Sequence, residues 1–207
     1  MLGRLHLVRH GEVANPRHVC YGDLPGFGLS PAGRAQAEQA AAHLGKLGAT
    51  LLFTSPLQRA VETAAAIGRR LGRNPVVDPR LTEWRLAMRW NGVVWEDLPE
   101  VFPGEVEAYL AHPADLPFSP ETLEAAAARV AALVEDLGRH HPGAAAVLVS
   151  HQDPVQAARL LLTGADLSAL HQRKPSHAAV VTLAPGTPWR EVSVWEPDVP
   201  ASPFPPV

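Results

Sequence analysis

The stretch "LVRHGEV", residues 7–13, decides how the N-terminal part of this chain is expected to fold. An apolar run from Leu5 to Val8 ends abruptly at Arg9 and His10, which is the pattern of a short strand buried on both faces. A cation and an imidazole therefore stand where a buried strand ends, and such polar residues at that position indicate a candidate functional site.

Strands and helices alternate outward from this stretch. Residues 29–47 predict a helix with Ser30 as N-cap and Pro31 at its first position, residues 51–53 a strand, and the residues after Ser55 and Pro56 a helix that Ser55 caps. The same criteria predict a short strand at 75–78, a helix at 119–138, a strand at 144–150, a helix at 154–164 capped by Asp153, and a terminal hairpin at 178–195. This alternation predicts an α/β fold, a three-layer α/β/α sandwich whose central sheet is mostly parallel with an antiparallel edge strand.

The domain organisation follows from where this pattern weakens. Residues 1–196 are predicted to form one α/β domain, because nothing divides a chain of 207 residues. Residues 84–118 hold scattered aromatic side chains among prolines and charges, and we expect them to form a partly irregular cover. Residues 197–207 contain five prolines and are predicted to be an extended C-terminal tail on the surface.

Composition limits the partners. The formal net charge is -3 with no basic stripe, so neither a nucleic acid nor a membrane is an expected partner. Cys20 is the only cysteine, which excludes an internal disulfide and a thiolate metal site. With no signal-like or membrane-spanning segment, a cytoplasmic protein is predicted. The terminal hairpin offers an edge strand through which a homodimer could pair.

Several polar residues stand where the predicted strands end or the helices after them begin. In such a sheet the carboxyl ends of parallel strands border one crevice, so we expect these polar side chains to lie together there. The residues are Arg9, His10, Arg59, Glu83 and His151. The planar, charged guanidinium groups of two arginines can donate hydrogen bonds to phosphoryl oxygens. A neutral imidazole can attack phosphorus. A glutamate with a raised pKa can protonate the leaving oxygen, and Gly11 would let a substrate approach His10.

The ordered set "LVRHGE", "GLSPAGRAQA", "TSPLQRAVETA", "RLTEW" and "VSHQD" resembles the histidine phosphatase superfamily, which includes the phosphoglycerate mutases. The resemblance covers residues 4–160 and implies a phosphoglycerate mutase-like fold. It implies that His10 is the phosphorylated nucleophile, that Glu83 is the acid–base residue, and that Asn15 contacts the phosphate. It implies that the rest of the phosphate pocket is Arg9, Arg59 and His151.

The sequence departs from the family pattern at three places, and we expect these departures to affect the choice of substrate rather than the reaction itself. Gln152 and Asp153 follow His151 where glycine is usual, Asn91 stands where relatives often have glutamate, and Glu121 is the only clear match to the segment before the long helix. The tryptophans at 84, 90 and 95 fit core packing better than a substrate cage, with an aromatic lid over an apolar leaving group as the alternative.

The sequence therefore predicts a phosphatase that hydrolyses small phosphate monoesters without metal or cofactor, because no metal-binding spacing is present. Two alternatives stay open at this stage, a phosphoglycerate mutase-type phosphoryl transfer and a non-catalytic phospho-ligand-binding pseudoenzyme. Sugar phosphates, phosphoglycerates, nucleotide-derived monoesters and phosphopeptides are all candidate substrates.

Overall fold

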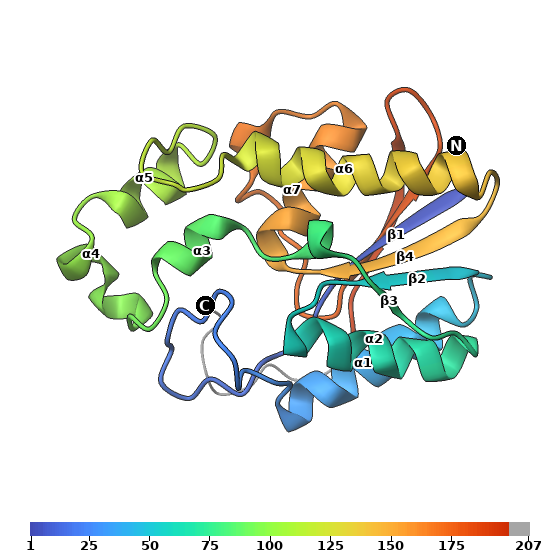
Figure 1. Cartoon of the computed structure of the whole chain (residues 1–207), viewed down its shortest axis with the longest axis horizontal. Helices are drawn as coiled ribbons and strands as arrows, with labels where there is room; N and C mark the ends of the chain where they lie inside the picture. Colours follow the sequence, from blue (N-terminus) through green and yellow to red (C-terminus); the bar gives the residue numbers. More distant parts are fainter. Residues whose placement is uncertain (199–207) are drawn as a thin grey trace.

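A six-stranded sheet forms the middle layer of the computed structural model, which describes residues 1–198 (Figure 1). Its order is β3-β2-β4-β1-β5-β6. Four strands pair in parallel, β1 (Arg4–Arg9), β2 (Leu51–Thr54), β3 (Val76–Val77) and β4 (Ala145–Ser150). The other two form an antiparallel edge, because β5 (Val180–Ala184) pairs antiparallel with β1 and β6 (Arg190–Trp195) pairs antiparallel with β5. The predicted mostly parallel sheet with an antiparallel edge is therefore confirmed.

Helices cover both faces of this sheet, so the predicted three layers are also confirmed (Figure 1). Helices α1 (Pro31–Leu44) and α2 (Gln58–Leu71) cover one face, while α6 (Leu123–His140) and α7 (Gln152–Thr163) cover the other. Along β1 the side chains alternate, because Leu5 and Leu7 pack in the core under α6 and α7 whereas Val8 packs toward α1 and α2. This alternation explains the continuous apolar run that precedes Arg9.

One of the predicted helix caps is present and two are wrong. The Ser30 hydroxyl accepts from the Gly33 N–H at 2.9 Å and caps α1 as predicted. Ser55 does not cap α2, which begins only at Gln58, after the extended Leu57. Asp153 does not cap α7 either, because that helix begins at Gln152 and places Asp153 in its first turn. Both side chains are instead turned to partners at the carboxyl end of the sheet.

The segment predicted as a cover consists of short helices at that end of the sheet (Figure 1). They are α3 (Arg85–Arg89), the 3-10 helix Trp95–Asp97, α4 (Leu98–Val101) and α5 (Glu105–Ala111). They enclose an apolar cluster of their own with Trp84, Trp90 and Leu98, which packs on Leu123 of α6. The cover is thus more helical than predicted, and its apolar cluster fixes it to the rest of the fold.

The C-terminal segment is described only in part. Of the predicted tail, only Pro197 and Asp198 belong to the described residues, and the Asp198 N–H donates to the Gln39 side chain at 2.8 Å. The prediction for 199–207 lies outside the described residues. Within residues 1–198, no helix is both long and apolar enough to cross a bilayer.

Candidate active site

Two histidines meet because β1 and β4 are neighbours. Arg9 pairs in register with Ser150, so the next residues, His10 and His151, both follow the carboxyl ends of adjacent strands. Their ring centroids lie 5.1 Å apart, and both side chains are almost fully buried. The predicted convergence of strand ends therefore occurs.

The hydrogen bonds of His10 fix its tautomer. Its Nδ1 lies 2.7 Å from the Gly11 carbonyl oxygen, which only accepts, so Nδ1 carries the proton. Its Nε2 lies 3.2 Å from the Nε–H of Arg59, which only donates, so Nε2 presents a lone pair. Burial, and next the positive charge of Arg59, hold the pKa of His10 well below its usual 6.5. His10 is therefore a neutral imidazole with its unprotonated nitrogen toward Arg59.

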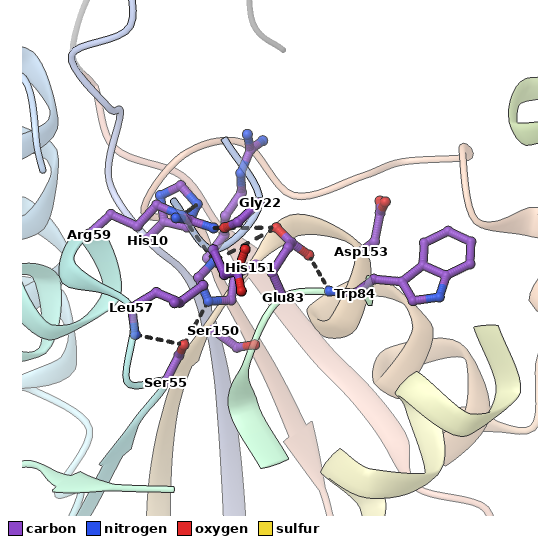
Figure 2. A network of polar contacts seen from close by, with 12 residues as sticks. His10, Gly22, Ser55, Leu57, Arg59, Glu83, Trp84, Ser150, His151 and Asp153 are labelled. Atoms are coloured by element: carbon purple, nitrogen blue, oxygen red, sulfur yellow. Dashed lines mark hydrogen bonds and ion pairs between the residues drawn. The ribbon is translucent and has the colours of Figure 1, made fainter. Parts of the chain in front are cut away.

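His151 is oriented in a related way (Figure 2). Its Nδ1 accepts from the same Arg59 Nε–H at 3.1 Å, and its Nε2–H donates to the Ser55 hydroxyl at 2.8 Å. Burial, and next Arg59, also lower the pKa of His151 well below 6.5. Ser55, which the sequence predicted as a helix cap, thus holds an imidazole of the site.

Arg59 stands at the second position of α2, one residue after the helix begins. Besides its shared Nε–H, it donates from Nη2 to the Gly22 carbonyl oxygen at 2.7 Å, and its guanidinium lies 4.7 Å from the centre of the Tyr21 ring. The 20–22 loop therefore holds the guanidinium from the side away from the sheet. Neither Tyr21 nor Gly22 was predicted, because nothing in that loop marks them as site residues.

Arg9 is held by the loop that precedes β5. Its two Nη atoms donate to the Pro175 carbonyl oxygen at 3.2 Å and to His177 Nε2 at 2.8 Å. Burial, and next Arg9, lower the pKa of His177 to about 2, so the ring remains a neutral acceptor. The Nε of Arg9 is buried and has no hydrogen-bond partner among residues 1–198. A buried guanidinium with a free donor is suited to an anionic ligand.

Glu83 faces these groups from the loop before α3. Its Oε1 accepts from the Trp84 N–H at 2.8 Å, while Oε2 lies 3.7 Å from His151 Nδ1 and 3.9 Å from Arg59 Nη2. Burial, and next the nearby Asp153 carboxylate, raise the pKa of Glu83 to about 7 against the opposing effect of Arg59. A carboxyl that titrates near neutral pH can both give and take a proton.

Asn15 and Gly11 have structural partners. The Asn15 amide donates to the Val19 carbonyl oxygen at 2.9 Å and accepts from the Val19 N–H at 3.1 Å, which closes the loop that follows β1. Contact of Asn15 with a phosphate stays a prediction. A Cβ at Gly11 would collide with the Gly33 carbonyl oxygen, so the glycine lets the start of α1 approach the loop. The predicted need for substrate access is not required to explain it.

A comparison with protein families decides the identification. The family model of the histidine phosphatase superfamily, branch 1, matches residues 5–196. The chain belongs to this superfamily. An uncharacterized protein of Mycobacterium tuberculosis is 38% identical over 187 residues, 86% of this chain and 88% of that protein. Phosphoserine phosphatase 1 of Hydrogenobacter thermophilus is 30% identical over 166 residues, 80% of this chain and 78% of the relative.

A solved structure agrees with the assignment to the histidine phosphatase superfamily. The mycobacterial glucosyl-3-phosphoglycerate phosphatase complexed with VO3 superposes with a TM-score of 0.83 at 30% identity, over 93% of this chain and 98% of that one. The recognised family and the phosphoglycerate mutase-like fold are therefore confirmed, whereas the roles of individual residues stay predictions.

The site of this histidine phosphatase opens into a cavity of about 220 Å³. Arg9, His10, Arg59 and Glu83 line its inner end. Its apolar wall comes from the cover and consists of Leu86, Ala87, Trp90, Trp95 and Leu110. Trp84 and Trp90 are buried in the apolar cluster of the cover and Trp95 packs against it, as the predicted core or lid packing requires, and Trp90 and Trp95 also border the cavity.

Polar residues beyond Tyr21 that the sequence did not assign to the site also line this cavity. They are Tyr109, Gln152, Asp153, His171 and Lys174. Within residues 1–198, no group of three or more histidine, cysteine or carboxylate side chains is placed to hold a metal ion. Chemistry without a metal stays a prediction that the experiments below address.

Proposed function

We propose that this histidine phosphatase hydrolyses phosphate monoesters without a metal, through a phosphohistidine on His10, with Glu83 as general acid and base. The observation that carries the proposal is the fixed tautomer of His10, whose Nε2 lone pair faces the Nε–H of Arg59, while Nη2 of the same arginine lies 3.9 Å from the Glu83 carboxyl. Arg9, Arg59 and His151 complete the proposed phosphate pocket.

In the first half-reaction, His10 Nε2 forms a bond to phosphorus while the ester P–O bond breaks. The proton of Glu83 passes to the leaving oxygen, so the alcohol departs neutral. The Gly11 carbonyl oxygen continues to accept from Nδ1–H and stabilises the positive charge that develops on the imidazole. The two guanidinium groups face the phosphoryl oxygens, where charge accumulates.

In the second half-reaction, water attacks the phosphohistidine. Glu83, now ionised, takes a proton from the water as the new P–O bond forms and the P–N bond to His10 breaks. Inorganic phosphate leaves, and the neutral imidazole and the protonated carboxyl are both regenerated. One carboxyl can serve both steps because its pKa of about 7 leaves both forms populated at neutral pH.

The names of two relatives support hydrolysis over transfer. Among the proteins similar to this chain are phosphoserine phosphatase 1 of Hydrogenobacter thermophilus and the glucosyl-3-phosphoglycerate phosphatase of Mycobacterium tuberculosis, the latter 34% identical over 157 residues, 72% of this chain and 70% of the relative. A mutase would instead return the phosphoryl group to a bound phosphoglycerate.

A cytoplasmic location and a homodimer paired through β6 stay predictions.

The test is hydrolysis of a panel of phosphate monoesters in excess EDTA by the wild-type chain and by His10→Ala. We expect phosphate release that needs no bisphosphate primer and that His10→Ala abolishes, with a quenched wild-type reaction showing one added phosphoryl group by mass. His6→Ala is the matched control, because it removes another buried histidine of β1 that lies outside the cavity. Equal activity in His10→Ala, or tight phosphate binding with no turnover, would contradict the proposal.

A further inference from the structure

Three polar side chains form one connected cluster on the cavity wall beyond Glu83. The Tyr109 hydroxyl donates to Asp153 Oδ2 at 3.0 Å and accepts from Lys174 Nζ at 2.8 Å. Lys174 Nζ also lies 2.9 Å from Asp153 Oδ1, and both side chains are less than a fifth exposed. The cluster brings together α5, α7 and the loop before β5, so it belongs to the folded cavity.

The charges that line the cavity have a definite balance. Among the described residues, its cations are Arg9, Arg59 and Lys174, and its carboxyls are Glu83 and Asp153. The two arginines match the two charges of a phosphate dianion, and Glu83 must be protonated to act as an acid. Lys174 and Asp153 compensate each other at 2.9 Å. No net positive charge is left for a second anionic group on the substrate.

The remaining surface around the cluster favours uncharged groups. Trp90 turns its only donor away from the cavity, since its Nε1–H is bound to Glu105 at 2.9 Å, and so presents the ring. Trp95, Leu86 and Leu110 extend this apolar wall. Lys174 Nζ donates a hydrogen bond to the Tyr109 hydroxyl, and its contact with Asp153 Oδ1 is an ion pair without hydrogen-bond geometry, so Nζ can still donate to a neutral acceptor.

We propose that the preferred substrates, given the function proposed above, are phosphate monoesters of uncharged alcohols with an apolar or aromatic body, and that Asp153 disfavours those carrying a second anion. A carboxylate near Lys174 would have to displace Asp153 or lie beside it, and like charges in a partly buried site repel strongly. Phosphoglycerates are therefore poor ligands of this cavity.

Matched phosphonates test this without depending on turnover. Benzylphosphonate, 4-carbamoylbenzylphosphonate and 4-carboxybenzylphosphonate share the phosphate-like group and differ by a neutral or an anionic substituent. Their dissociation constants are measured by calorimetry on the full chain at one pH just below 7, where Glu83 is still largely protonated, the three phosphonate groups share the same ionisation state and the carboxy substituent is ionised. We expect the carbamoyl compound to bind at least about tenfold more tightly than the carboxy compound.

Variants of Asp153 test whether this carboxylate causes the difference in affinity between the carbamoyl and the carboxy compound. Asp153→Asn is expected to reduce the difference to less than about threefold, and Asp153→Glu, which keeps the charge, to preserve it. Asp97→Asn is the control, because it removes an exposed carboxylate of the cover that does not line the cavity. Equal or tighter binding of the carboxy compound to the wild-type chain, or an unchanged difference in Asp153→Asn, would overturn the proposal.

The two proposals fail differently. If the phosphonates bind in the expected order but no phosphate monoester is hydrolysed, the specificity inference holds and the proposed hydrolysis does not. If benzyl phosphate is hydrolysed but 4-carboxybenzyl phosphate is the better substrate by kcat/KM, the hydrolysis holds and the inference is overturned.

Discussion

The Nε–H of Arg59 donates to Nε2 of His10 across 3.2 Å, and to Nδ1 of His151 across 3.1 Å. One N–H thus orients both imidazoles, and it does so from the start of α2, where the helix dipole favours an anion. In the proposed mechanism, a phosphoryl group bound by this guanidinium would lie next to Nε2 of His10. The same arginine would then both bind the anion and align the proposed nucleophile.

Arg59→Lys tests whether the positive charge of residue 59 suffices or whether the hydrogen-bond geometry of the guanidinium is also needed. The ammonium keeps the positive charge but lacks both the shared Nε–H and the fork that reaches the Gly22 carbonyl oxygen. We expect kcat/KM for phosphate monoesters to fall about a hundredfold, because charge-assisted hydrogen bonds contribute about 1.5–3 kcal/mol each. Arg80→Lys is the control, since Arg80 pairs with Asp78 and Asp136 away from the cavity. A decrease of less than about threefold in Arg59→Lys would show that charge alone suffices.

Glu83→Gln tests the proposed acid with substrates of different leaving groups. Benzyl phosphate needs a proton on its leaving oxygen, whereas 4-nitrophenyl phosphate does not. We expect kcat/KM to fall at least about a hundredfold for the first and less than about tenfold for the second. Glu121→Gln is the control, because Glu121 pairs with Arg129 outside the cavity. Equal slowing of both substrates would remove Glu83 from the acid role.

The pH dependence of the wild-type enzyme follows from the pKa of Glu83. In the proposed first half-reaction the protonated carboxyl is the active form, so raising the pH through about 7 would remove the acid. We expect kcat/KM for benzyl phosphate to decrease about tenfold per pH unit above this value, and Glu83→Gln to lack this limb. The pKa of His10 lies well below 6.5, so the nucleophile stays neutral over this range. A wild-type profile that rises through pH 7 would contradict the assignment.

The fold and the strand-end positions of Arg9, His10 and His151 could be predicted because local patterns specify them, whereas Arg59 and Glu83 were assigned to the site on the family resemblance. The buried run before Arg9, the Ser30–Pro31 helix start and the strand before His151 are each readable from adjacent residues. Parallel strands then carry their last residues to one edge of the sheet, whichever order the strands take.

The rest of the site depends on contacts between distant segments. Tyr109 reaches Asp153 and Lys174 across 44 and 65 residues, and no periodicity or spacing marks such a meeting. Ser55 and Asp153 were misassigned for a related reason. Each stands before or near a helix start, where a cap is the usual role. The Asp153 carboxylate instead pairs with Lys174, and the Ser55 hydroxyl accepts from the Leu57 N–H at 3.2 Å and also binds His151.

Ser55→Ala tests the role of this serine as a positioning residue. Without the hydroxyl, His151 loses the acceptor of its Nε2–H and its fixed tautomer, so we expect kcat to decrease about tenfold. Thr182→Val is the matched control, because it removes the buried hydroxyl that lies 3.0 Å from His6 Nδ1, a hydroxyl–imidazole pair outside the cavity. Both variants should lose similar stability, with Tm measured by calorimetry, but only Ser55→Ala should lose activity. Equal kcat values in the two variants would show that Ser55 is merely structural.

Inorganic phosphate should stabilise the fold through Arg9 and Arg59. Ligand at a hundredfold excess over its dissociation constant adds about 2.7 kcal/mol to the free energy of unfolding. For a chain of this length we expect a Tm increase of about 5–10 °C, measured by calorimetry with and without phosphate. The increment should survive in His10→Ala and shrink by more than about half in Arg9→Gln, because the buried Nε of Arg9 is the free donor. Arg4→Gln, which removes a positive charge from the other end of β1, should keep the full increment. An increment absent from the wild-type chain would mean that these buried arginines and histidines belong to an ordinary core.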